Sequence, residues 1–133
     1  MVNNYKKGEK CDRPWGCWRV EETGNGFVVK IIAVNPEAQL SLQSHEHRSE
    51  KWEIMGGSAE VTLGESVILM KKGEIVEIPR GSIHSLRNPG SEVLLVKETQ
   101  LGKILDENDI VRYLDVYGRC SENCKCKNKS GIA

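Results

Sequence analysis

Short stretches of apolar and β-branched residues recur along the chain, and none of them shows helical spacing. They read GFVVKIIAV, LSLQSH, KWEIM, AEVTL, SVILM, IVEIP, HSLRN and EVLLVKE. Turn-forming segments such as NPEA, KKGE, PRGS and NPGSE separate them. Many short strands joined by tight turns predict an all-β domain, either a sandwich or a small barrel.

The C-terminal part departs from this pattern. The segment DENDIVRYL, residues 106–114, is the one place where the sequence predicts a short turn or helix, with Asp106 as its cap. A length of 133 residues is enough for a single hydrophobic core. We therefore predict an N-terminal extension over residues 1–12 and one all-β domain over residues 13–119.

After Arg119 the chain becomes polar, locally basic and rich in Lys, Asn and Ser. This composition predicts a flexible tail over residues 120–133. The CSENCKC segment of the tail keeps open an alternative, a site for a soft metal. No second cysteine pair follows at the spacing of a zinc site, so a flexible tail is the preferred interpretation. The cysteines of this segment are Cys120, Cys124 and Cys126.

Charge and hydropathy exclude several classes of partner. The chain has 19 Lys and Arg and 19 Asp and Glu, so its formal net charge is zero. A nucleic-acid partner is not expected, because only the tail is basic. No apolar run approaches the roughly 18 residues of a membrane span, and the first residues, MVNNYKKGEK, lack the apolar core of a signal peptide. We expect a cytoplasmic protein without a membrane partner.

Two of the three histidines lie in the segment LQSHEHRSEKW, which runs from Leu42 to Trp52. Successive side chains of a strand point to opposite faces. Strict alternation predicts one face with Ser41, Gln43, His45 and His47 and the opposite face with Leu40 and Leu42. The opposite face is more apolar than the surface that a monomer ordinarily exposes, so we expect a homodimer.

The same alternation places a carboxylate in the core. Glu50 shares its predicted face with Trp52 and Ile54, and His84 shares its face with Leu86. A buried carboxylate is costly unless a cation compensates it, so a metal ion would explain this placement. Satisfied polar core residues, or a surface cluster, remain the alternatives at this point.

The segment GEIVEIPRGSIHSLRN has the spacing of the second sequence motif of the cupin superfamily, which this chain resembles. The matching residues are Gly73, Pro79, Gly81, His84 and Asn88. Counting back from Glu50 and Gly57 gives the first motif. The resemblance implies a jelly-roll barrel whose metal is held by Gln43, His45, Glu50 and His84, with His47 as an alternative ligand. Zinc is the preferred ion, and Mn, Fe, Ni and Co remain open.

A narrower resemblance covers the chain from Arg13 to Arg119. The motifs RPWG, LSLQSHEHRSEKW, IPRGSIH, NPG and DIVRYLDVYGR are similar, in this order, to the isomerase domain of type II mannose-6-phosphate isomerases. That domain is often the C-terminal half of bifunctional mannose-1-phosphate guanylyltransferases. The resemblance implies a cupin, often dimeric, that converts mannose 6-phosphate to fructose 6-phosphate for nucleotide-sugar and polysaccharide synthesis. No guanylyltransferase part is expected here, because a glycine-rich nucleotide loop is missing.

The chain departs from the family pattern at four positions next to the motifs, and each departure leaves the proposed metal ligands intact. The departures are Glu46, Lys51, Ile83 and Ser85. Ile83 and Ser85 replace polar residues close to the expected substrate phosphate, so they bear on substrate identity.

An isomerase also needs a proton carrier and a phosphate site. His47 is the expected general base, since an inward histidine titrates near neutral pH. Arg48 and Arg80 are the candidates for the phosphate, because a guanidinium can grip it with two hydrogen bonds. Two other functions remain open. One is a non-catalytic metal-binding cupin for a sugar or sugar nucleotide, and the other is a different cupin enzyme, an epimerase or an iron-dependent dioxygenase.

Overall fold

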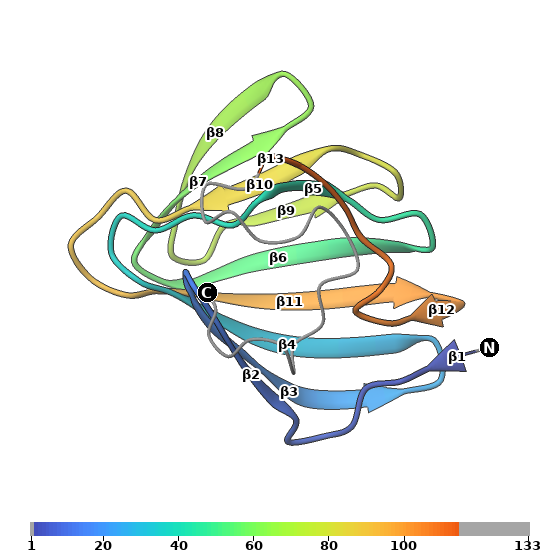
Figure 1. Ribbon diagram of the computed structural model, residues 1–133. Helices are drawn as coiled ribbons and strands as arrows, with labels where there is room; N and C mark the ends of the chain where they lie inside the picture. Colours follow the sequence, from blue (N-terminus) through green and yellow to red (C-terminus); the bar gives the residue numbers. More distant parts are fainter. Residues whose placement is uncertain (1, 115–133) are drawn as a thin grey trace.

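The computed structural model describes residues 2–114 and shows strands, turns and loops, with no helix among these residues (Figure 1). The strands are β1 (Val2–Asn3), β2 (Lys10–Arg13), β3 (Gly16–Gly24), β4 (Phe27–Val34), β5 (Leu42–Ser44), β6 (Arg48–Gly56), β7 (Ser58–Leu63), β8 (Ser66–Lys71), β9 (Ile75–Ile78), β10 (His84–Arg87), β11 (Leu94–Gly102), β12 (Ile104–Leu105) and β13 (Val111–Leu114). The prediction of an all-β fold is confirmed.

Two large sheets make up the jelly roll. One has six strands in the order β2-β3-β4-β11-β6-β9, and the other has five in the order β13-β5-β10-β7-β8. In Figure 1 the hairpin of β7 and β8 projects at one end, and the short pair of β1 and β12 lies at another edge. Apolar side chains from both sheets, including Trp18, Ile32, Val61, Leu86 and Val96, form one buried core. Such burial is the main favourable contribution to folding.

The inner face of the six-stranded sheet is not wholly apolar. Strand β4 alternates half-buried and buried positions, and its buried side chains include Lys30. Strand β11 buries Glu98 and Gln100 in the same way. Glu98 lies between Trp52 of β6 and Lys30 of β4 in the strand register. The sheet therefore carries a polar band into the space between the sheets, next to the apolar core.

The helical alternative for residues 106–114 is wrong. The Asp106 carboxylate accepts the amide hydrogen of Asn108 at 2.7 Å, so it caps a turn and not a helix. The chain then enters β13, which pairs antiparallel with β5. Pairing with an existing strand satisfies the backbone groups of this segment at once, whereas a helix this short gains little by itself.

The predicted outer apolar face is also wrong at Leu40. Its side chain is only 8% exposed and belongs to the core. Leu40 precedes β5, and its amide donates to the carbonyl oxygen of Leu86 at 2.9 Å, which draws it between the sheets. Strand alternation therefore did not apply here. The homodimer stays a prediction, now without support from Leu40.

Several predicted segments lie at or beyond the described ends of the chain. Strand β1 and most of β2 lie within the stretch expected to be an N-terminal extension. The boundaries at residues 12 and 119 stay predictions. The tail over residues 120–133, with Cys120, Cys124 and Cys126, lies outside the described residues, as does Arg119.

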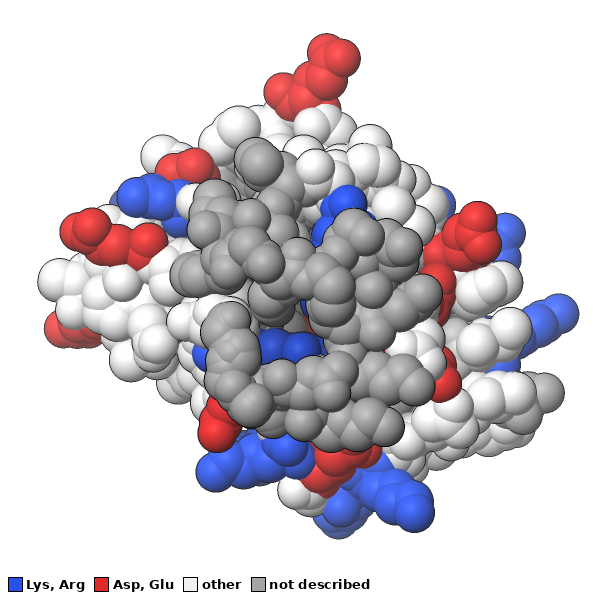
Figure 2. Space-filling view, viewed as in Figure 1, with Lys and Arg blue, Asp and Glu red and all other residues white. Residues whose placement is uncertain are grey.

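Basic and acidic side chains are interspersed around the rim of the face in Figure 2, and neither sign forms a continuous surface there. This agrees with the balanced charge of the sequence. Within residues 2–114 no helix has the length and apolar character that crossing a membrane requires.

Candidate metal centre

Three buried side chains from both large sheets converge inside the jelly roll. His45 directly follows β5, Glu50 lies on β6, and His84 begins β10. His45 Nε2 lies 3.3 Å from Glu50 Oε2, and His84 Nε2 lies 3.6 Å from Glu50 Oε1. Their ligand atoms all lie within 4.8 Å of one another. We refer to these three residues as the His/Glu cluster.

Backbone carbonyl groups orient both imidazole rings toward the cluster. His45 Nδ1 lies 2.7 Å from the carbonyl oxygen of Asp109, and His84 Nδ1 lies 2.9 Å from that of Ser82. A carbonyl oxygen only accepts, so each Nδ1 carries a proton, and Nε2 is the nitrogen left to coordinate an ion when the ring is neutral. Burial, with Arg48 and His84 nearby, also holds the pKa of His45 well below its usual range. Both rings therefore present Nε2 as a metal ligand does.

Glu50 supplies the negative charge of the cluster. Burial alone would raise the pKa of its carboxyl group, but Arg48 and His84 bring that pKa below its ordinary value. Oε2 accepts a hydrogen bond from Arg48 Nε at 2.8 Å. The buried Oε1 has no hydrogen-bond partner among the described residues. An orphaned carboxylate oxygen facing two imidazole nitrogens is the arrangement that a cation would complete.

The spacing of the cluster fits a divalent ion. Two donors that each lie about 2.1 Å from a tetrahedral ion are about 3.4 Å apart. The two distances between imidazole nitrogen and carboxylate oxygen are 3.3 and 3.6 Å. Arg48 Nη2 also donates to His45 Nε2 at 3.2 Å, so an ion bound at that nitrogen takes the place of this contact.

Gln43 is the fourth ligand that the sequence predicted. It lies directly across from His84 in the register of β5 and β10, so the two side chains share a face. Its Nε2 donates to the hydroxyl and the carbonyl oxygen of Ser41 at 3.0 and 3.2 Å. The side-chain oxygen, which is the atom that a metal would use, is not engaged by these two bonds.

His47 does not point inward, contrary to the prediction. Its side chain is 47% exposed, with Nε2 3.7 Å from a Glu46 carboxylate oxygen. The chain bends at residues 45–47 between β5 and β6, so the two-residue period breaks there. The Asp109 carboxylate holds the bend through the amides of Glu46 and His47 at 2.8 and 3.0 Å. His47 therefore lies outside the His/Glu cluster.

The second motif contacts the same bend. Gly81 has a φ of 85°, which favours glycine, in the turn that follows Pro79. Its amide donates to the carbonyl oxygen of His45 at 2.9 Å. The glycine of one motif thus positions a predicted ligand of the other.

The two arginines proposed for a phosphate lie in different places. Arg48 is buried against Glu50 and His45. Burial lowers its pKa, but Glu50 together with the other nearby acidic groups outweighs that effect, so the pKa is raised. Arg80 is exposed on the turn after Pro79. Arg48 lines the same pocket as His45, whereas Arg80 does not belong to the lining of that pocket.

The pocket contains charged residues that the sequence interpretation missed. Its lining is formed by Arg13, Trp15, Trp18, Lys30, Ile32, Leu40, Gln43, His45, Arg48, Glu98, Glu107, Ile110 and Arg112. Glu98 accepts from the Trp52 indole at 2.9 Å and from the Gln100 amide at 2.7 Å. Burial, followed by the nearby Glu50 charge, raises the pKa of Glu98. Strand alternation in EVLLVKETQ places Glu98 on the same face as Leu94 and Val96. This pattern could have predicted from the sequence that Glu98 is buried.

Solved structures show which class of fold this is. The chain superposes on a cupin domain of Schizosaccharomyces pombe Cnp3 with a TM-score of 0.59, 22% identity and coverage of 64% of this chain and 61% of that chain. A protein of Klebsiella pneumoniae with a double-stranded β-helix domain gives a TM-score of 0.63 and 21% identity, with coverage of 86% of this chain and 90% of that chain. Oxalate decarboxylase of Lactobacillus farciminis gives a TM-score of 0.68 and 18% identity, with coverage of 78% of this chain and 33% of that chain. The fold is therefore a cupin jelly roll, as predicted.

Within that class, the chain belongs to the mannose-6-phosphate isomerase C-terminal family, whose sequence model matches residues 2–115. It is 49% identical over 109 residues to the alginate biosynthesis protein AlgA of Pseudomonas putida, covering 82% of this chain and 22% of AlgA. The xanthan biosynthesis protein XanB of Xanthomonas campestris is 48% identical over 110 residues, covering 83% of this chain and 24% of XanB.

A third relative, mannose-1-phosphate guanylyltransferase RfbM of Salmonella typhimurium, is 39% identical over 110 residues, with 83% and 23% covered. The chain thus spans less than a quarter of the length of these relatives.

Proposed function

We propose that the chain is a metal-dependent aldose–ketose isomerase of a hexose phosphate, with mannose 6-phosphate and fructose 6-phosphate as its substrate and product. The observation that carries this proposal is the His/Glu cluster, whose His45 lines a pocket, in a chain from the mannose-6-phosphate isomerase C-terminal family. Relatives named for alginate and xanthan biosynthesis support a role in nucleotide-sugar or polysaccharide synthesis. Such a role would be cytoplasmic.

Gln43, His45, Glu50 and His84 would hold the divalent ion. The nitrogen and oxygen donors suit Zn²⁺, which we prefer, and also Mn²⁺, Fe²⁺, Ni²⁺ and Co²⁺. The bound ion would supply a Lewis acid for the sugar carbonyl oxygen. The Asp109 and Ser82 carbonyl groups keep both histidine rings in the tautomer that this requires.

The reaction moves a proton from one carbon to its neighbour while a hydroxyl proton moves between their oxygens. Because His47 is on the surface, another residue must carry the carbon-bound proton. Glu98 is the carboxyl group in the pocket lining that is not paired with a cation by a direct contact. The Trp52 and Gln100 bonds fix its orientation, as a proton carrier requires. We assign it the role of general base that was expected for His47.

Two measurements test the proposal. Metal content of purified protein is compared with that of His84→Ala, which removes one ligand, and of His47→Ala, which removes the surface histidine. We expect His84→Ala to lose the metal and His47→Ala to keep it. Fructose 6-phosphate formation from mannose 6-phosphate is then followed in a coupled assay with stripped and reloaded protein.

The outcome separates the remaining functions. Turnover that needs the metal and no oxygen supports the isomerase. Metal-loaded protein that binds mannose 6-phosphate without producing fructose 6-phosphate would instead be a binding module for a sugar or sugar nucleotide. Oxygen consumption with iron alone would favour a dioxygenase, and formation of another aldose phosphate an epimerase.

A further inference from the structure

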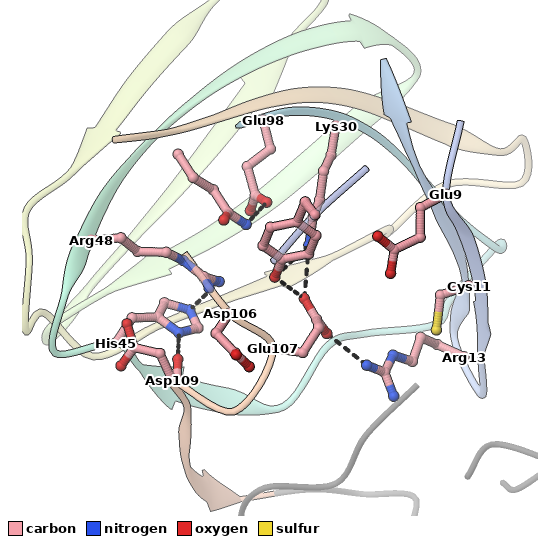
Figure 3. Close-up of polar contacts among 12 residues, drawn as sticks. Glu9, Cys11, Arg13, Lys30, His45, Arg48, Glu98, Asp106, Glu107 and Asp109 are labelled. Carbon is pink, nitrogen blue, oxygen red and sulfur yellow. Dashed lines mark hydrogen bonds and ion pairs between the residues drawn. The ribbon is translucent and has the colours of Figure 1, made fainter. Parts of the chain in front are cut away.

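A second buried group of charges lies along the same pocket. Arg13 Nη2 donates to Glu107 Oε1 at 2.7 Å, and Lys30 Nζ donates to Glu107 Oε2 at 2.8 Å. The Tyr5 hydroxyl donates to the same Oε2. Figure 3 shows Arg13 and Lys30 reaching the carboxylate from different sides. We call Tyr5, Arg13, Lys30 and Glu107 the Glu107 cluster.

The two cations belong to the sheet, whereas the carboxylate comes from a turn. Arg13 ends β2, and Lys30 lies within β4, paired to strands on both sides. The Lys30 ammonium is further held 3.9 Å from the centre of the Trp18 ring and 4.3 Å from that of Tyr5. Glu107 lies in the turn between β12 and β13. The positive side of the cluster is therefore fixed by regular structure, and the negative side is not.

Exposure follows the same division. The side chains of Arg13 and Lys30 are 6% and 3% exposed, and that of Glu107 is 23% exposed. The depressed pKa of Glu107, where Lys30 and Arg13 outweigh the effect of burial, keeps it ionised at neutral pH. Two buried cations are thus paired directly with one partly exposed carboxylate. The cluster keeps one unit of positive charge in excess.

We propose that the Glu107 carboxylate occupies the binding position of an anionic ligand group, and that a phosphate displaces it to bind Arg13, Lys30 and Tyr5. A phosphate monoester carries about 1.5 to 2 negative charges near neutral pH, which matches two cations better than one carboxylate does. Its oxygens also suit the guanidinium, ammonium and hydroxyl donors now directed at Glu107. The displaced carboxylate can turn toward solvent, because it is on a turn and already partly exposed.

The identity of this phosphate as that of a hexose phosphate rests on the proposed function, but the anion position itself does not. Inorganic phosphate is therefore the first probe, and mannose 6-phosphate and unphosphorylated mannose are the second and third. Arg48 and Arg112 line the same pocket and add positive charge around it. In contrast to the sequence interpretation, the proposal assigns the phosphate to Arg13 and Lys30 and not to Arg80.

The test compares Glu107→Gln with the unaltered protein by titration calorimetry. If the carboxylate competes with the ligand, phosphate binds Glu107→Gln about tenfold more tightly, since a charged competitor is gone. Glu21→Gln is the matched control, because Glu21 makes an exposed pair with Arg19 on β3. It should leave phosphate affinity unchanged. Arg13→Met should weaken phosphate binding about tenfold or more.

Equal or weaker phosphate binding by Glu107→Gln would overturn the proposal and make Glu107 a permanent structural counterion. Phosphate affinity that does not respond to Arg13→Met would overturn it as well. If Glu107→Gln fails to fold, Glu107→Asp withdraws the carboxylate while keeping the charge, and tighter phosphate binding is again expected. Failure of the isomerase proposal looks different, because phosphate affinities would change as expected while no fructose 6-phosphate forms.

Discussion

The His/Glu cluster and the Glu107 cluster are two buried charged groups that meet one pocket, the first through His45 and the second through Arg13, Lys30 and Glu107. They differ in the sign of the charge that each lacks. Glu50 has an oxygen without a hydrogen-bond partner among the described residues, directed at two imidazole rings. Glu107 has both oxygens engaged by donors, and its surroundings keep a positive excess. The first arrangement favours binding of a cation, and the second favours binding of an anion with more negative charge than one carboxylate. A ligand with an oxygen for a metal and a phosphate at another end complements both.

The clusters also differ in how they are built. Glu50 and His84 lie on strands, and the bend with His45 is fixed by Asp109 and Gly81. Glu107 lies on a turn that reaches over to a sheet. We therefore expect substitutions in the His/Glu cluster to destroy a site, and substitutions of Glu107 to modulate one.

The largest expected effect on stability is that of Glu50→Gln. The change leaves the buried Arg48 charge without its partner and should lower the free energy of unfolding by about 3–5 kcal/mol. Metal binding should be lost with it. Denaturant unfolding and metal analysis provide the measurements. Stability equal to that of the unaltered protein would mean that the more distant Glu98 and Glu107 charges suffice as counterions of Arg48.

Glu98→Gln tests a residue between the two clusters. Glu98 lies opposite Lys30 in the sheet register, and the nearby Glu50 charge adds to the effect of burial in raising its pKa. Because Glu98 is the assigned proton carrier, the substitution should lower kcat by a factor of about 10² to 10⁴ while the metal is retained. The coupled assay and metal analysis are run on the same preparation. Full activity of this variant would remove Glu98 from the mechanism and leave the metal assignment intact.

Asp109→Ala should loosen the bend that carries His45. Its carboxylate holds two amides of that bend, at 2.8 and 3.0 Å. Metal affinity should fall by about 10 to 100-fold, as for other partners that orient a ligand. Competition with a chelator measures the change. Asp12→Ala, at an exposed position on β2, is the control and should not alter the affinity.

Glu107→Gln should lower the thermal stability in a pH-dependent way. Because the folded-state pKa of Glu107 lies below its ordinary value of 4.5, its stabilising contribution is present above that value and disappears as the pH falls below it. The difference in Tm between the unaltered protein and the variant should therefore be largest near neutral pH and shrink in acid. A difference that grows in acid contradicts the assigned ion pairs.

The smallest effect is expected for His47→Ala. An exposed side chain away from the core should change stability by no more than about 0.5 kcal/mol. A fall of kcat by two or more orders of magnitude would restore His47 as the general base and require the bend to reorganise when substrate binds.

The sequence by itself determined the all-β class, the cupin motifs, and the inward positions of Glu50 and His84. These features follow from local turn chemistry and from the two-residue period of a strand, which holds wherever pairing is regular. The spacing of the motifs also brought His45 into the predicted ligand set, and the structure places it beside Glu50.

Tertiary structure alone decided the rest. His47 turned outward and Leu40 inward because the chain leaves strand geometry at both places, and no period applies to a bend. The Glu107 cluster joins residues that are 77 and 94 positions apart. A turn selects such partners only once the two sheets have packed, because the cost of burying each charge is set by what lies opposite it in space and not by its neighbours in sequence.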